Sequence, residues 1–323
     1  MRGRALIPAL AAVILLAGCS PMGSSTTAPV PAPTRARVSS GSTTVVSHST
    51  ARQHLTALAD GIGARPPGSP QEARAAAYVR EQLERSGYAV ETQPFEFRSS
   101  RSTATSANLQ AVKAGAVAEE IVVGAHYDSV DDGEGADDNA SGVATLLALA
   151  EQLRGVDTHY TIRFIAFGAE EANDLYGSQH AVAQLDAVER DRIHAMINLD
   201  SLVSGDIAYA YSDAAPLLDW TVRAATEAGF DLQTRPVRDL HDDSDYYSYQ
   251  SVGIPFLYFE ATNWNLGDRD GFTRVDPRYG DNGEIIHTSY DRLSYLDSTF
   301  PGRVDHYLSL YGTLLYAIAT QYR

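Results

Sequence analysis

The chain has a single cysteine, Cys19, among its 323 residues, so an intrachain disulfide is excluded. Apolar packing must hold the fold, and an apolar content of 44% can fill a substantial core. Basic residues are scarce, with 25 Lys and Arg against 41 Asp and Glu and a formal net charge of −16 at pH 7. This charge argues against a nucleic-acid surface and against docking on anionic lipid by charge. Acidic solubility and a preference for cationic substrates explain the charge equally well.

Long apolar runs are lacking except at residues 9–16. That run follows Arg2 and Arg4, is too short to cross a bilayer, and ends in the letters LAGC at Cys19, which is typical of an export signal. The ending resembles the lipobox of bacterial lipoproteins, whose cysteine is acylated; the alternative is an ordinary signal peptide with an incidental cysteine. We expect residues 1–19 to export the chain to the cell envelope, with a lipid on Cys19 as its only membrane attachment.

Residues 20–47 are rich in Ser, Thr, Pro, Ala and Gly, and they contain few bulky apolar side chains. Such a segment cannot bury enough surface to order itself, so we expect a disordered tether. Residues 48–323 show no internal repeat and fit one large α/β domain.

Helical and strand patterns alternate through this domain. Ser69, Pro70 and Glu72 predict a capping box that starts one helix, and Gly87 ends it. Strands that alternate with helices predict a three-layer αβα sandwich with a mixed, mostly parallel central sheet. We expect helices at 48–60, 70–86, 140–153, 178–188, 215–228 and 304–322, and strands at 88–97, 121–128, 161–167, 195–199, 207–211 and 254–259.

Metal-binding residue types stand where apolar runs end. In open α/β sheets, ligands bind beyond the carboxyl ends of the strands, where several of these side chains fall. Zinc accepts His nitrogen and carboxylate oxygen, and five ligands with one shared suffice for two metals about 3.5–4 Å apart. One Glu is then left over to act as a base. The residues concerned are His126, Asp138, Glu170, Glu171, Asp200 and His287.

Each of these residues also has an ordinary interpretation. A His-x-Asp sequence is usually a surface pair, and the acidic segment at 131–138 fits a solvated loop. Glu170 and Glu171 are harder to explain in that way, because two adjacent carboxylates at the end of a buried strand need a cation or a proton. A pair of bound metal ions would compensate the unfavourable free energy of burying all of these carboxylates.

Five motifs occur in the order found in the M28 family of co-catalytic zinc peptidases, which this chain resembles from about residue 48 to the C-terminus. They are GAHYDS, GADDNASG, GAEEANDLYGS, INLDS and IHTSYD. Two further stretches, residues 63–88 and 260–272, resemble a bacterial aminopeptidase of that family. The resemblance implies two Zn²⁺ ions per chain.

The resemblance also implies a role for each metal-binding residue. His126 and Asp200 would hold one zinc, Glu171 and His287 the other, and Asp138 would bridge the two. Asp137 is the rival for the bridge, but Asp138 stands where the family has its bridging Asp relative to the Ser-Gly pair.

The remaining roles follow from the same resemblance. Asp128 would accept the other ring N–H of His126 and fix its tautomer. Glu170 would be the general base that takes a proton from the metal-bridging water and delivers it to the leaving amine. Some relatives place an oxyanion-stabilising Tyr directly before the last His ligand, where this chain has Ile286.

Six further residues are weaker candidates for the substrate pocket. Trp264 fits either a specificity wall or a Trp packed under a loop, and two aspartates fit attraction of a basic first residue. The set is His241, Asp245, Trp264, Asn265, Asp268 and Asp270.

The leading function is an exported zinc aminopeptidase that acts on the N-termini of peptides or proteins. Residues 97–121 are too few for the domain that some relatives insert, so we expect an open site. One alternative is a glutaminyl-cyclase-like transferase with the same fold and one zinc. The other is a non-catalytic peptide-binding protein, which predicts missing ligands or a replaced Glu170.

Overall fold

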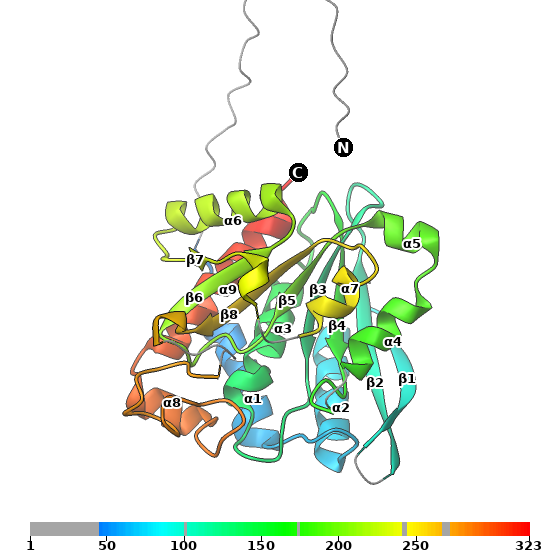
Figure 1. Ribbon diagram of the computed structural model, residues 1–323. Helices are drawn as coiled ribbons and strands as arrows, with labels where there is room; N and C mark the ends of the chain where they lie inside the picture. The colour runs from blue at the N-terminus through cyan, green and yellow to red at the C-terminus, as the bar shows by residue number, and fades with distance from the viewer. Residues whose placement is uncertain (1–44, 100–101, 173–174, 241–243, 267–271) are drawn as a thin grey trace, which may run out of the picture. The chain divides into compact units, whose positions relative to one another are not determined.

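The computed structural model describes residues 45–99, 102–172, 175–240, 244–266 and 272–323. In this part of the chain, helices cover both faces of one eight-stranded sheet (Figure 1). No helix there is long and apolar enough to span a membrane. The helices are α1 (Ser49–Ile62), α2 (Pro70–Arg85), α3 (Gly142–Gln152), α4 (Tyr176–Gln184), α5 (Ala187–Arg192), α6 (Ala215–Glu227), α7 (Tyr246–Gln250), α8 (Leu293–Thr299) and α9 (Arg303–Gln321).

The strands follow the order β1-β2-β4-β3-β5-β8-β6-β7 across the sheet. The four central strands, β4, β3, β5 and β8, run parallel, and the antiparallel pairings lie toward the edges. The predicted αβα sandwich with a mixed sheet is confirmed. The strands are β1 (Val90–Arg98), β2 (Thr103–Lys113), β3 (Glu120–His126), β4 (Thr161–Phe167), β5 (Ile193–Leu199), β6 (Ile207–Ser212), β7 (Gln233–Thr234) and β8 (Phe256–Thr262).

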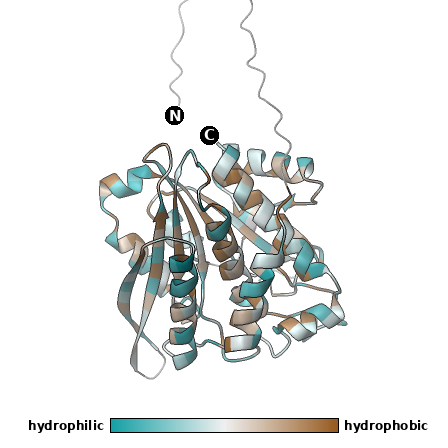
Figure 2. Cartoon of the chain, turned by 180° about the vertical axis from the view of Figure 1, so that it is seen from behind, coloured by the Kyte–Doolittle hydropathy of each residue, from teal (hydrophilic) through white to brown (hydrophobic). Residues whose placement is uncertain are grey.

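The central strands are apolar on both faces because each face meets its own core. In β3, Ile121 and Val123 join the core beneath α1, α3 and α9, whereas Val122 joins the core beneath α4 and α7. Such two-faced burial is what the continuous apolar run of β3 predicts. Figure 2 shows the apolar colours running through these strands, and both apolar and hydrophilic colours on the helices.

Close packing at the centre of the sheet requires a glycine in β3. A Cβ at Gly124 would lie 2.5 Å from the Phe167 ring and 2.9 Å from Met196. The missing side chain leaves room for Phe167 of β4 and Met196 of β5, and the parallel strands bring their carboxyl ends together at one edge. His126 is the last residue of β3, and Glu170 and Asp200 lie in the segments that follow β4 and β5.

Two expectations about helices were wrong in detail. The single helix predicted at 178–188 is two helices. The helix α4 ends at Gln184, and Asp186 starts α5 with a capping box of its own. At α2, Ser69 accepts a hydrogen bond from the Glu72 backbone as predicted, but the Glu72 side chain does not complete the box. It bonds Gly68, Ser106 and Ala169 instead.

Strand β2 was not predicted, because its polar sequence lacks a clear apolar alternation. It pairs with β1 on one side and β4 on the other, so residues 103–113 extend the sheet. At the other end of the domain, the Val46 amide donates to Thr313 Oγ1 of α9 at 2.8 Å. The last residues of the predicted tether therefore contact the domain.

Candidate active site

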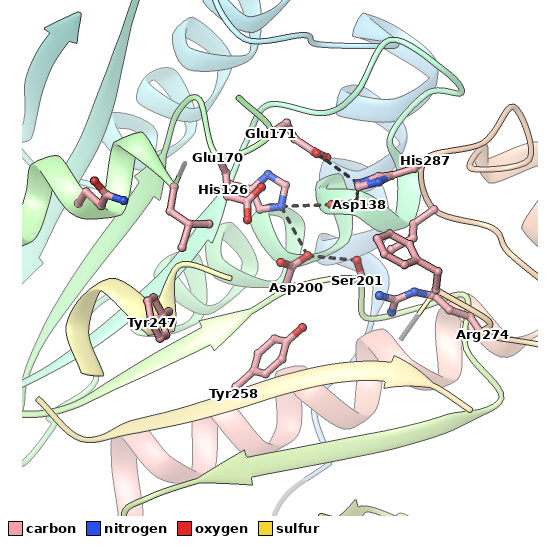
Figure 3. Close-up of a pocket in the computed structure, with 14 residues that line it drawn as sticks. His126, Asp138, Glu170, Glu171, Asp200, Ser201, Tyr247, Tyr258, Arg274 and His287 are labelled. Carbon is pink, nitrogen blue, oxygen red and sulfur yellow. Dashed lines mark hydrogen bonds and ion pairs between the residues drawn. The ribbon is translucent and has the colours of Figure 1, made fainter. Parts of the chain in front are cut away.

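Six side chains from five separate parts of the sequence converge at the carboxyl ends of the parallel strands (Figure 3). They surround a cavity of about 400 Å³, whose other lining residues are both apolar, such as Phe272 and Ile286, and polar, such as Arg274. All six residues that sequence reasoning proposed as ligands or base line it. They are His126, Asp138, Glu170, Glu171, Asp200 and His287.

Asp138 lies between the two histidines. Its Oδ1 is 3.1 Å from Nε2 of His126, and its Oδ2 is 3.0 Å from Nε2 of His287. Asp137 is turned away, since its carboxylate accepts hydrogen bonds from the backbone of Val203 and Ser204. The two adjacent aspartates thus have different neighbours, and only Asp138 has one oxygen on each imidazole.

Glu171 and Asp200 extend the cluster in opposite directions from Asp138. Glu171 Oε2 is 3.2 Å from Nε2 of His287, and Asp200 Oδ1 is 3.5 Å from Nε2 of His126. Ser244 Oγ donates to the other Asp200 oxygen at 2.7 Å and so fixes that carboxylate. The two residues predicted to hold each zinc are therefore in contact with one another: His126 with Asp200, and His287 with Glu171.

Asp128 has more neighbours than sequence reasoning proposed. Its Oδ1 is 3.5 Å from Nδ1 of His126, which is an ion-pair distance rather than a good hydrogen bond. Its two oxygens instead accept the backbone N–H groups of Glu170 at 3.2 Å and Glu171 at 3.0 Å. Asp128 therefore orients the segment that carries both glutamates as well as facing the imidazole.

Left-handed backbone occurs at three non-glycine residues that are, or directly adjoin, the proposed ligands and base. Ala169 precedes Glu170 with φ +54°, Ser201 follows Asp200 with φ +51°, and His287 itself has φ +58°. Such conformations cost roughly 1–3 kcal/mol each and persist only where the surroundings impose them. The surrounding structure therefore holds these residues in an unfavourable backbone conformation, and that conformation sets the direction of the side chains of the site.

Burial and crowding shift the acidity of the cluster. Burial, with the charge of Asp138 added, raises the pKa of Glu171 to about 7. Burial raises the pKa of Glu170 well above its ordinary value, although the charge of His126 opposes this. Burial alone would lower the pKa of His287, but hydrogen bonds to Asp138 and Glu171 raise it to about 11. The carboxylates therefore demand compensating positive charge.

The donor set fits a metal on observations of the structure itself. Two groups of donor atoms lie within 4.8 Å of one another among the described residues: His126 with Asp138 and Glu171, and His126 with Glu170 and Asp200. Glu171 Oε1 is buried without a hydrogen-bond partner, as expected of an oxygen that serves as a metal ligand. The second group includes Glu170, which sequence reasoning reserved as the base.

Sequence reasoning missed two buried residues that hold the loops of the site. Asp291 accepts the backbone N–H groups of Asp137 at 2.7 Å and Asp138 at 3.1 Å. Arg65 is fully buried and donates to the backbone carbonyls of Tyr127, Gly63, Glu134 and Gly135 at 2.7–2.9 Å. Both residues lie in stretches that carried the resemblance, GARPPGSP and IHTSYD, and that membership was the only available signal.

The weaker candidates are placed as follows. Trp264 is buried under its loop and donates from Nε1 to the Tyr211 hydroxyl, so it packs in the core rather than on the cavity wall. Asp245 is buried and does not line the cavity, although its charge acts on Glu170. Residues 241, 268 and 270 lie outside the described residues.

Comparison with known proteins identifies the family. The model described as peptidase family M28 matches residues 108–311. The alkaline phosphatase isozyme conversion protein of Escherichia coli strain K12 is 28% identical over 279 residues, or 75% of this chain and 81% of that protein. The aminopeptidase YwaD of Bacillus subtilis strain 168 is 33% identical over 181 residues, or 54% of this chain and 38% of the relative.

Solved structures share the fold. BSAP, a zinc aminopeptidase from Bacillus subtilis, matches with a TM-score of 0.70 and 18% identity over 86% of this chain and 96% of that chain. A glutaminyl cyclase from an Acidobacteriales bacterium matches with a TM-score of 0.69 and 20% identity over 89% and 99%. The chain belongs to peptidase family M28, as the motifs predicted, and it is a hydrolase that acts on peptide bonds.

Proposed function

We propose that this protein is a di-zinc aminopeptidase that removes N-terminal residues from peptides or proteins. The observation that carries the proposal is the position of Asp138, with one oxygen 3.1 Å from His126 and the other 3.0 Å from His287. A carboxylate with one oxygen on each of two ligand imidazoles is the arrangement that a shared metal ligand needs. Relatives named as aminopeptidases support the same reading.

Five side chains would hold the metal ions. His126 and Asp200 would bind one, Glu171 and His287 the other, and Asp138 would bind both. Bound zinc supplies Lewis acidity, which lowers the pKa of a coordinated water to about 7 and polarises a carbonyl oxygen.

Glu170 would serve as the general base. It lines the cavity next to His126, and burial raises its pKa, which favours uptake of a proton from the attacking water. Glu170 would accept a proton from the attacking water and then deliver that proton to the nitrogen of the leaving amine. Asp128 would keep the Glu170 backbone in place through its hydrogen bond.

Restriction to N-termini would follow from the charge of the cavity. A free α-amine is cationic, and Glu170 and Asp200 present carboxylates beside one another in the same cavity. An internal peptide nitrogen carries no charge and would gain nothing from them.

The experiment that tests the proposal joins metal analysis with a panel of aminoacyl chromogenic substrates. We expect two zinc ions per chain, loss of turnover on chelation, and recovery on adding zinc. Glu170→Gln should retain the metal and lose about 10²- to 10⁴-fold in kcat, the usual worth of a general base. Normal turnover of that variant would remove Glu170 from the role.

The similarity to glutaminyl cyclases makes a transferase the second candidate. A peptide with N-terminal Gln separates the two functions, because a cyclase converts it without releasing an amino acid. Cyclisation with one zinc per chain would replace the aminopeptidase proposal.

We further propose that the chain is exported and anchored by a lipid on Cys19. The apolar run at 9–16 and the LAGC ending support this, and both lie outside the described residues.

A further inference from the structure

Glu72 is a buried glutamate outside the metal-binding cluster. It lies in the first turn of α2 and is 3% exposed. Its Oε2 accepts the Gly68 N–H at 2.5 Å, and its Oε1 accepts the Ser106 hydroxyl at 2.5 Å and the Ala169 N–H at 3.1 Å. All three donors are neutral, so the carboxylate links α2 and β2 to the segment after β4 without an ion pair.

The segment after β4 is held by two buried carboxylates. The backbone N–H of Ala169 donates to Glu72, and the next two, from Glu170 and Glu171, donate to Asp128. Three consecutive amides are therefore fixed by side chains from α2 and from the segment directly after β3. The backbone at Gly168, directly before these amides, is packed closely against β2, since a Cβ there would lie 2.2 Å from Ser106 Oγ.

The backbone at Ala169 decides where the two glutamates point. Its φ of +54° turns the chain at the end of β4, after which Glu170 lies beside His126 and Glu171 reaches His287 at 3.2 Å (Figure 3). An alanine disfavours this conformation, and the hydrogen bond from its N–H to Glu72 opposes that cost. The bond from Ala169 to Glu72 therefore stabilises the turn that aims both side chains.

We propose that Glu72 is a positioning residue of the active site: it holds Ala169 in its left-handed conformation and thereby directs Glu170 into the cavity and Glu171 toward His287. The assignment of these two glutamates as base and ligand rests on the proposed function. Glu72 does not line the cavity, so its effect passes through the backbone.

A carboxylate is required at this position because both of its oxygens accept from backbone N–H groups, Gly68 on one side and Ala169 on the other. A glutamine of the same shape has one acceptor oxygen and one NH₂ group. In either orientation its NH₂ faces a backbone N–H, so one of the two bonds is lost. Glu72→Gln is therefore the sharpest substitution.

The matched control is Ser69→Ala. Ser69 caps the same helix by accepting the Glu72 backbone N–H at 3.0 Å, and it does not touch Ala169. Its loss weakens the start of α2 and leaves the carboxylate of Glu72 in place. Comparing the two variants distinguishes an effect of weakening the start of α2 from an effect of losing the hydrogen bond that holds the segment at 168–171.

Steady-state kinetics at saturating zinc form the first arm. We expect Glu72→Gln to lower kcat by about 10- to 100-fold with KM unchanged. Ser69→Ala should leave kcat unchanged. An unchanged kcat in Glu72→Gln, or an equal loss in both variants, would overturn the proposal.

Amide hydrogen exchange of the metal-free protein forms the second arm and needs no activity. We expect faster exchange of the peptide that spans 168–171 in Glu72→Gln and no change there in Ser69→Ala. If Glu72→Gln does not fold, Ser106→Ala removes one bond to the same oxygen and should raise exchange at 168–171 by a smaller factor. Protection equal to wild type would refute the role of Glu72. A wild type without peptidase activity would refute the proposed function, while this arm would still test Glu72.

Discussion

Buried polar residues hold this protein together at many points, and His54 shows what one of them contributes. It lies in α1 with Nδ1 2.8 Å from the Tyr78 hydroxyl of α2, and burial lowers its pKa to about 4. The folded state therefore favours the neutral ring, whereas the unfolded chain protonates near pH 6.5. Stability from this residue is complete above pH 6.5 and is lost as the pH falls from 6.5 toward 4.

The difference between the two pKa values of His54 lowers the free energy of unfolding by about 3 kcal/mol at the acid end of that window. In His54→Gln, the free energy of unfolding should fall less steeply between pH 6.5 and 4 than in wild type, as measured by urea denaturation. His306→Gln, at an exposed position of α9, is the control and should follow the wild-type curve. Parallel curves for His54→Gln and wild type would show that the buried ring does not resist protonation.

The central strands derive their stability from burial on both faces. Ile162 of β4 is 1% exposed, whereas Val112 on the neighbouring β2 is 45% exposed. Removing a fully buried side chain loses its transfer free energy and leaves a cavity, but an exposed side chain loses little of either.

Alanine substitutions in these two adjacent strands measure that difference. We expect Ile162→Ala to lower the free energy of unfolding by about 2–5 kcal/mol. Val112→Ala should change it by less than about 0.5 kcal/mol. Equal costs in a denaturant titration would contradict a core centred on the parallel strands.

On the scale of the whole chain, the N-terminal segment would decide where the enzyme works. If Cys19 carries the lipid, Cys19→Ser should move the protein from the membrane fraction to the soluble exported fraction. The residues that line the cavity lie elsewhere in the sequence, so we expect kcat not to change. Fractionation followed by immunoblotting measures the distribution, and unchanged membrane partitioning would count against lipidation.

Local patterns in the sequence predicted most of the sandwich, and the six residues that we propose as ligands or base all line the cavity. The central strands were readable because a parallel strand buried on both faces is a continuous apolar run, as in β3. His126, Glu170 and Asp200 were readable because each follows such a run. Strand β2 was not readable, since its pairing with β1 and β4, rather than its own side chains, makes it a strand.

What the sequence determined by itself was the set of residue types and their order along the chain, because periodicity and strand-end position are local properties. Only the tertiary structure decided which partner each side chain meets. Asp137 and Asp138 are chemically identical neighbours, yet one carboxylate meets the backbone at 203–204 and the other meets two imidazoles. Glu72 looked like half of a capping box and instead holds Ala169. Most of these partners lie far away in the sequence, 66 residues for Asp137 with Val203 and 97 for Glu72 with Ala169, and no local pattern records them.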